Sequence, residues 1–202
     1  IASIPQHVTI ARLTAARGLL RQAKGWVDSF KTAASRQNDT SLFSSQDLQV
    51  SPVNLTRLMI EVGEDFRYQA KRCWVHISTD EDSLLSFGTY SCDEAKIRNA
   101  LMCIIDNAVK YTKKGSGETV YLRGEQFDEK GRLGLTVTNV SLIKLSLAEQ
   151  RLIFDRWFRS EQAEREHVQG MGLGLTIAAE IVKLHGGELL VSQSDVSTQN
   201  GT

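Results

Sequence analysis

Residues 101–112 read LMCIIDNAVKYT, and they decide the fold because their apolar positions fit the second half of a helix over 93–111. Four apolar side chains of this helix, spaced four, three and four residues apart, form one stripe: Ile97, Leu101, Ile104 and Ala108. An amphipathic helix of this kind is expected to bury its apolar stripe against a sheet or against other helices.

One edge of the same helix carries side chains that suit a ligand. Cys103, Asn107 and Lys110 lie beside the apolar stripe, and Tyr111 lies on its border. An amide oxygen is a hard ligand that suits Mg²⁺, an ammonium suits phosphate oxygens, and an aromatic face can stack on a base. The plain alternative is an amphipathic helix whose boundary happens to carry Asn and Lys.

A glycine run, GMGLGL at 170–175, opens a second predicted helix over 173–185. Glycines spaced by two let backbone N–H groups approach a phosphate, and a helix N-terminus adds a favourable dipole. A dinucleotide-binding fingerprint would follow a strand, whereas a polar, charged stretch, 159–169, precedes this run and fits a mobile lid. A flexible loop before a helix is the alternative interpretation.

The rest of the chain divides into three regions. Residues 8–35 predict one long helix within a first region, 1–36, because apolar side chains recur every seven residues in two adjacent rows: Leu13, Leu20 and Val27, then Ala16, Ala23 and Phe30. Residues 37–52 are polar and predict a linker. From 53 to 202 helices alternate with strands. A helix begins at Asn54 as N-cap, and the predicted strands are 74–78, 84–88, 119–126, 131–138 and 188–192.

This alternation predicts an α/β fold: a mixed sheet with helices on one face, preceded by a coiled-coil-like helix.

The 202 residues include 24 basic and 24 acidic side chains, so nothing in the charge favours nucleic acid or an anionic membrane as partner. No apolar run reaches the roughly 18 residues of a spanning helix. Three dispersed cysteines support neither disulfides nor a zinc site, which fits a reducing cytoplasm. The chain begins at Ile1 without a signal peptide, and it can be a piece of a longer protein.

Taken together, residues 53–192 resemble the ATP-binding domain of sensor histidine kinases, within the superfamily of gyrase, Hsp90, histidine kinases and MutL. Residues 101–112 resemble the N box of that family, and 153–159, IFDRWFR, resemble its F box. Residues 170–175 resemble its second glycine box, and 185–188, HGGE, resemble the start of the following strand. The three boxes occur in the family's order and spacing, which makes the resemblance far more specific than any one of them.

The resemblance implies a two-layer α/β sandwich of the Bergerat type, with Mg·ATP between the N-box helix and a glycine-rich lid. By position, Asn107 would bind Mg²⁺, Lys110 would contact phosphate, and Tyr111 would line the adenine side. The second glycine box would shape the phosphate end through Gly170, Gly172, Gly174 and Leu175. Arg159 would reach either phosphate or only the surface, while Phe154 and Phe158 would pack where the lid leaves the core.

Two departures from the family matter for nucleotide binding. Cys103 stands where the family has a second Asn, and where the ATP-hydrolysing branches have a Glu that activates water, so an ATP-hydrolysing switch is not expected. Asn139 stands where the family's first glycine box has an Asp that accepts a hydrogen bond from the adenine amine, and both following glycines are replaced. Because neutral hydrogen bonds are weaker than charged ones, this change predicts about tenfold weaker binding. Leu142 or Ile143 could crowd the pocket further.

Neither the acceptor histidine nor the final strand of the family is evident. None of the four histidines, His7, His76, His167 and His185, lies in a motif that resembles the family's phosphoacceptor box. The acceptor is therefore expected upstream of Ile1, and the long helix resembles the second helix of a dimerisation hairpin. The family closes its sheet with a strand after a Gly-Thr pair, and this sequence stops at Gly201-Thr202, so an exposed sheet edge is expected.

The sequence thus favours the ATP-binding catalytic domain of a two-component histidine kinase, which transfers the γ-phosphoryl group of Mg·ATP to a histidine outside this chain. The expected partners are a second copy through the N-terminal helix and a response regulator, with any membrane attachment through upstream segments. Asn139 and the missing glycines favour the alternative, a degenerate relative that binds no ATP and acts as a scaffold or regulator of a response-regulator partner.

Overall fold

The computed structural model describes residues 24, 43, 48–85, 87–113, 115, 117–126 and 133–193. The predicted helix over 8–35 and most of the predicted linker lie outside these residues, as does the end of the chain, and the predictions made for them stay predictions. No helix in the described part is both long and apolar enough to cross a lipid bilayer.

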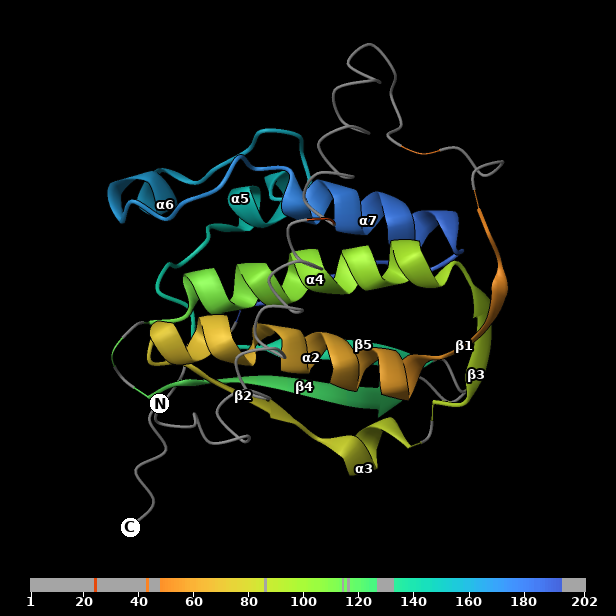
Figure 1. Ribbon diagram of the computed structural model, residues 1–202. Coiled ribbons are helices and arrows are strands. Elements are labelled where there is room, and N and C mark those ends of the chain that lie inside the picture. The colour runs from red at the N-terminus through yellow and green to blue at the C-terminus, as the bar shows by residue number, and fades with distance from the viewer. Residues whose placement is uncertain are drawn as a thin grey trace, which may run out of the picture.

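Three helices lie side by side over a three-stranded sheet (Figure 1). The helices are α2 (Leu55–Arg72), α4 (Glu94–Tyr111) and α7 (Gly174–Leu184), with α4 in the middle. The sheet has the order β2 (His76–Thr79), β4 (Thr119–Gln126) and β5 (Leu133–Thr138). β2 runs parallel to β4, and β5 runs antiparallel to it, so the predicted mixed sheet is confirmed.

A second, two-stranded sheet corrects the prediction for two segments. β1 (Ser51–Asn54) pairs antiparallel with β3 (Thr89–Cys92), so a strand occupies the end of the predicted linker. The predicted strand over 84–88 is wrong, because the short helix α3 (Glu81–Leu84) ends there instead. The Asp80 side chain caps α3 by accepting from the Ser83 N–H, and Leu84 is fully buried. The burial of Leu84 therefore comes from its place at the end of a short helix and not from the inward face of a strand.

The predicted starts of α2 and α4 are confirmed by their N-caps. The Asn54 side chain accepts from the Arg57 N–H at 2.8 Å, and Asp93 accepts from the Lys96 N–H at 3.0 Å. Burial favours a raised pKa for Asp93, but hydrogen bonds from Gln49 and Lys96 outweigh it and hold the pKa below its usual value. These caps satisfy N–H groups that the helix itself leaves unpaired.

His185 joins the end of α7 to the start of α4. Its Nε2 accepts from the Asp93 N–H at 3.0 Å, so Nδ1 carries the ring proton that is donated to the Ile181 carbonyl at 2.7 Å. Both ring nitrogens therefore make hydrogen bonds.

The hydrophobic core has two parts that meet at α4. The larger part lies between α2, α4 and the sheet, and its fully buried side chains include Met59, Phe66, Ile105 and Leu122. The smaller part lies between α4 and α7, around Ala100, Cys103, Ile177 and Ile181. The buried surface of α4 is therefore wider than the single stripe predicted from its spacing, while Ile97 and Ile104 of that stripe are only half buried.

The predicted strand over 188–192 is wrong. These residues form no strand in the structure, and Leu190 and Val191 are 68% and 41% exposed. An apolar run indicates a strand only when a neighbouring strand pairs with it and one face is covered. Among the described strands β5 pairs only with β4, so no strand pairs with this segment, and Leu189 packs against the smaller part of the core instead.

Two short helices lie between β5 and α7. α5 (Leu147–Leu152) begins with a capping box in which Ser146 and Glu149 satisfy each other's backbone N–H groups. α6 (Glu161–Arg165) is capped by Ser160. The polar stretch predicted to be a lid therefore contains a helical turn with its own cap.

Gly124 of β4 lies against α3 and the residues that follow it, with little space for a side chain. A Cβ at this position would clash with Phe87 Cε2 and would lie 2.6 Å from the Ser83 carbonyl oxygen, whereas a Cβ at Gly88 would meet nothing within 4 Å. We expect Gly124→Ala to lower the free energy of unfolding by about 1–3 kcal/mol, because overpacking forces neighbouring atoms apart. Gly88→Ala is the matched control, and urea unfolding followed by circular dichroism measures both. Equal unfolding midpoints for the two variants would contradict this packing.

Candidate functional site

An open cleft lies beside α4 and is bounded by the segment after β5 and by the segment before α7. Its volume is about 1930 Å³, above the ~300–1,000 Å³ of an ordinary small-molecule pocket, so it has room beyond one small ligand. All of the residues predicted to contact a nucleotide line it: Asn107, Lys110, Tyr111, Asn139, Arg159, Gly170, Gly172, Gly174 and Leu175. Segments up to about 70 positions apart in the sequence thus meet at one site.

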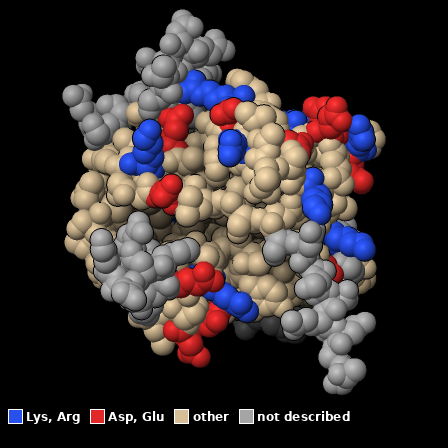
Figure 2. All heavy atoms as spheres, turned by 180° about the vertical axis from the view of Figure 1, so that it is seen from behind, with Lys and Arg blue, Asp and Glu red and all other residues tan. Residues whose placement is uncertain are grey.

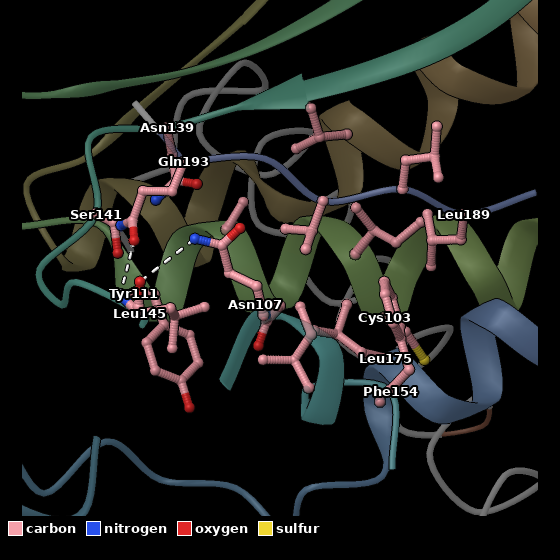
Figure 3. Close-up of a pocket in the computed structure, with 18 of the residues that line it drawn as sticks. Cys103, Asn107, Tyr111, Asn139, Ser141, Leu145, Phe154, Leu175, Leu189 and Gln193 are labelled. Atoms are coloured by element: carbon pink, nitrogen blue, oxygen red, sulfur yellow. Dashed lines mark hydrogen bonds between the residues drawn. The ribbon is translucent and has the colours of Figure 1, made fainter. Parts of the chain in front are cut away.

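Cys103, Asn107 and Tyr111 come from one face of α4, since they are spaced by four residues (Figure 3). Asn107 is half buried and lines the cleft between the other two. Cys103 is only 2% exposed, and burial, aided by the charge of Asp106, raises the pKa of its thiol to about 12. The thiol is therefore protonated at neutral pH and cannot serve as a general base.

Lys110 has a partner that the sequence analysis missed. Its Nζ lies 2.6 Å from Oδ2 of Asp106, a buried carboxylate that also accepts from Gln69 Nε2 at 3.1 Å. The spacing of four residues on a helix is the signal that could have revealed this ion pair. The ammonium that the resemblance assigns to phosphate is thus held in place by Asp106 and borders the cleft.

The loop after β5 is tied to the end of α4. The Leu142 N–H donates to the Tyr111 carbonyl at 2.6 Å, and the Lys113 N–H donates to the Val140 carbonyl at 3.3 Å. Ile143 is buried within the loop, so it packs inward while still bordering the cleft. The loop that lacks the family's glycines is therefore anchored by backbone hydrogen bonds and one buried side chain.

Gln193 is a second residue that the sequence analysis missed. Its Nε2 donates to the Ile143 carbonyl at 2.8 Å, and its Oε1 accepts from the Leu145 N–H at 2.7 Å. Figure 3 shows this side chain beside Asn139 and Ser141. A side-chain amide here bridges two backbone groups of the loop, as a neighbouring strand would. No spacing rule in the sequence points to this contact.

Asn139 follows β5 directly and lies at the same end of the cleft as Tyr111 (Figure 3). Its side-chain nitrogen, Nδ2, is buried and has no hydrogen-bond partner within the described residues. Tyr111 is half buried, and that burial raises the pKa of its hydroxyl against the opposing charge of Arg159. This end of the cleft thus offers an aromatic ring and an amide with an unused donor.

The glycine run serves two different purposes. Gly172 has φ +70°, and a Cβ there would lie 2.5 Å from the Phe158 carbonyl oxygen. Its own carbonyl accepts from the Trp157 N–H at 2.9 Å, so this glycine is required for a close turn against the F-box segment. A Cβ at Gly170 would meet nothing within 4 Å. Gly174 begins α7, which has no side-chain N-cap, so the first N–H groups of the helix remain available to an anion.

Arg159 holds the base of the predicted lid. Its Nη2 donates to the Val168 carbonyl at 2.6 Å, which closes the ends of the segment that contains α6. The guanidinium nevertheless borders the cleft, as do Phe154 and Phe158, both half buried. Arg159 therefore has a structural contact in this state in addition to any contact with a ligand.

The described residues hold no group of three or more His, Cys, Asp or Glu side chains that could bind a metal ion. Mg²⁺ commonly takes only one or two protein ligands together with water and the phosphates of a nucleotide. Asn107 fits that pattern as a neutral oxygen ligand within the cleft. On the face opposite to that of Figure 1, the basic and acidic side chains of the described residues are interspersed, with no large patch of one sign among them (Figure 2).

Comparison with known proteins agrees with this geometry. The family described as histidine kinase-, DNA gyrase B-, and HSP90-like ATPase matches residues 92–202, more than half of the chain. The circadian input-output histidine kinase CikA of Synechococcus elongatus is 24% identical over 147 residues, which are 73% of this chain and 19% of CikA. The sensor histidine kinase YkoH of Bacillus subtilis is 32% identical over 117 residues, 57% of this chain and 23% of YkoH. The chain thus spans about a fifth of the length of these curated relatives.

Solved structures confirm the predicted α/β fold. The mycobacterial sensor histidine kinase MprB aligns with a TM-score of 0.54 and 26% identity, over 68% of this chain and 80% of that one. Full-length ShkA in complex with AMPPNP aligns with a TM-score of 0.58 and 20% identity, over 92% of this chain and 35% of that one. At that identity the second likeness concerns the fold alone.

The two roles of the glycine run can be separated by mutation. We expect Gly172→Ala to lower the free energy of unfolding by about 2 kcal/mol or more, because it combines a positive φ with a backbone clash. Gly170→Ala, two residues away, should stay within about 0.5 kcal/mol of the unchanged protein. Chemical unfolding of both variants without any nucleotide provides the measurement. A tolerated Gly172→Ala would show that the turn against Phe158 is not required.

Proposed function

This chain belongs to the family of histidine kinase-, DNA gyrase B- and HSP90-like ATPases, and on that premise we propose that it binds Mg·ATP in the cleft beside α4 as the catalytic domain of a two-component sensor kinase. The bound nucleotide would give up its γ-phosphoryl group to a histidine. The observation that carries the proposal is the convergence of three separate segments, 107–111, residue 139 and 170–175, on this one cleft.

Asn107 is the proposed protein ligand of Mg²⁺. Its amide lies in the middle of the cleft between Tyr111 and Cys103, and it is half buried, so that a bound ion would be partly shielded from bulk water. The ion would neutralise charge on the phosphates when it is bound. Water and phosphate oxygens would fill the other coordination positions, as is usual for Mg²⁺.

Lys110 and the start of α7 are the proposed phosphate contacts. Asp106 fixes the Lys110 ammonium at the border of the cleft, and the uncapped N–H groups after Leu173 add donors where the start of α7 lines the same cleft. Phosphoryl transfer needs little more from a protein than positioning and charge neutralisation. The chain's own groups therefore suffice to hold a triphosphate in place for an acceptor.

Transfer to a histidine is favoured over hydrolysis by water. Hydrolysis would benefit from a general base near the phosphates, and Cys103, at the position of that base in the hydrolysing branches, is buried with its thiol protonated. The comparisons lend no support to the alternative of a scaffold that binds no nucleotide, since these relatives are named histidine kinases.

The remaining parts of the function rest on the family and on sequence outside the described residues. We infer that the acceptor histidine lies outside this chain, that residues 8–35 pair with a second copy, and that a response regulator receives the phosphoryl group. The proposed compartment is the cytoplasm, where ATP and Mg²⁺ are available.

Calorimetric titration with a non-hydrolysable ATP analogue and Mg²⁺ tests the proposal. We expect a dissociation constant in the micromolar to sub-millimolar range for the unchanged protein. In Asn107→Ala the affinity should fall at least tenfold, because the metal loses its protein ligand. In the absence of Mg²⁺ the two proteins should bind the analogue about equally. Asn99→Ala is the matched control, since Asn99 lies two turns earlier on the same face of α4 but outside the cleft lining.

A folded protein that shows no binding at millimolar nucleotide would overturn the kinase proposal for this chain and favour the scaffold. Equal losses of affinity in Asn107→Ala and Asn99→Ala would instead show that the substitutions disturb helix α4 itself. That result would contradict the assignment of Asn107 as a ligand of the metal.

A further inference from the structure

Asn139 has an unused hydrogen-bond donor at the end of the cleft where Tyr111 lies. Its Nδ2 is buried and has no partner within the described residues. The neighbouring polar groups are already occupied: Gln193 bridges Ile143 and Leu145, and the Ser141 hydroxyl accepts from the Ile143 N–H at 3.2 Å. A buried donor without an acceptor costs free energy, so the protein alone does not favour the present orientation of this amide. A half rotation about the last side-chain bond would present the donor to the cleft that Asn139 lines, where a ligand can supply the missing acceptor.

The position of this amide is fixed by the backbone. Asn139 follows the last residue of β5, and the loop after it is bonded to the C-terminal end of α4 through Leu142 and Tyr111. The amide is thereby held at the same end of the cleft as the Tyr111 ring (Figure 3). In the proposed complex that end receives the base, because Asn107 and the start of α7 lie further along the cleft.

An amide and a carboxylate differ in what they can recognise on a purine. A carboxylate accepts only, so it pairs with the 6-amino group of adenine and repels a 6-oxo group. An amide has one donor end and one acceptor end. It can accept from the adenine amine while donating to N1, or, turned by half a rotation about its last bond, donate to a 6-oxo group while accepting from N1–H.

We propose that Asn139 makes this site permissive for the purine base, so that it takes 6-oxopurine nucleoside triphosphates, inosine and guanosine triphosphate, as well as ATP. This inference rests on the proposed function, since it concerns the same cleft. It goes beyond that proposal because it assigns base specificity to one residue, whose amide donor has no partner within the described residues.

Competition between ATP and inosine triphosphate isolates the 6-position together with the neighbouring N1, because neither purine carries a 2-amino group. With Mg²⁺ present, we expect the unchanged protein to bind the two with dissociation constants within about threefold of each other. Asn139→Asp keeps the shape of the side chain and removes the donor. It should weaken binding of inosine triphosphate at least tenfold relative to ATP, since a site built for one hydrogen-bond pattern strongly rejects the other.

Asn139→Leu serves as the matched control. It removes donor and acceptor together, so it should weaken both nucleotides by similar factors and leave their ratio near that of the unchanged protein. Guanosine triphosphate, which adds a 2-amino group, then reports whether the cleft also accommodates that group.

Two results would overturn this inference while leaving the proposed function intact. One is a preference of more than tenfold for ATP over inosine triphosphate in the unchanged protein. The other is an unaltered ratio of the two affinities in Asn139→Asp. If neither nucleotide binds, the proposed function itself fails, and the assignment of base specificity fails with it.

Discussion

The burial of α4 on two sides is the constraint on which the rest of the structure depends. Ile105 and Val109 pack against α2 and the sheet, while Ala100 and Cys103 pack against α7. Each large aliphatic side chain removed from water contributes about 1.5–3 kcal/mol. A helix held on both sides cannot rotate without exposing one of these surfaces. The polar face that carries Asn107 and Tyr111 is therefore fixed in direction, and the cleft forms where that face remains uncovered.

The loop after β5 illustrates how a site can keep its shape after its glycines are replaced. Glycine would allow a tight approach of the backbone, but here backbone hydrogen bonds to Tyr111 and Lys113, together with the side chain of Gln193, determine the path. Ile143 turns inward and is buried, so the loop accommodates a large side chain while its backbone hydrogen bonds are kept. The crowding that the replaced glycines imply is thus partly relieved by packing, and the hydrogen-bonding character of Asn139 becomes the larger change.

Long periodic segments and caps could be predicted from the sequence, whereas contacts between distant segments could not. The spacing of α4 and the Asn54 cap of α2 depend on residues within one or two turns, and the structure has them as expected. The predictions of strands over 188–192 and 84–88 were wrong because a strand requires a pairing partner, and local sequence does not identify that partner. At the site, the resemblance supplied Asn107 and the glycines. The bridge made by Gln193 joins positions about 50 residues apart, and no local rule would reveal it.

The glycine run shows why a motif cannot be read as a list of ligand contacts. Gly172 is required by its positive φ and by the Phe158 backbone, and both requirements hold with no ligand bound. The lid that precedes it is likewise held by the protein itself, since Arg159 binds the Val168 carbonyl and the Val168 N–H binds Ala163. The root of the lid is therefore part of the folded core. Freedom to respond to a nucleotide is left to the open position of Gly170 and to the uncapped N–H groups that begin α7.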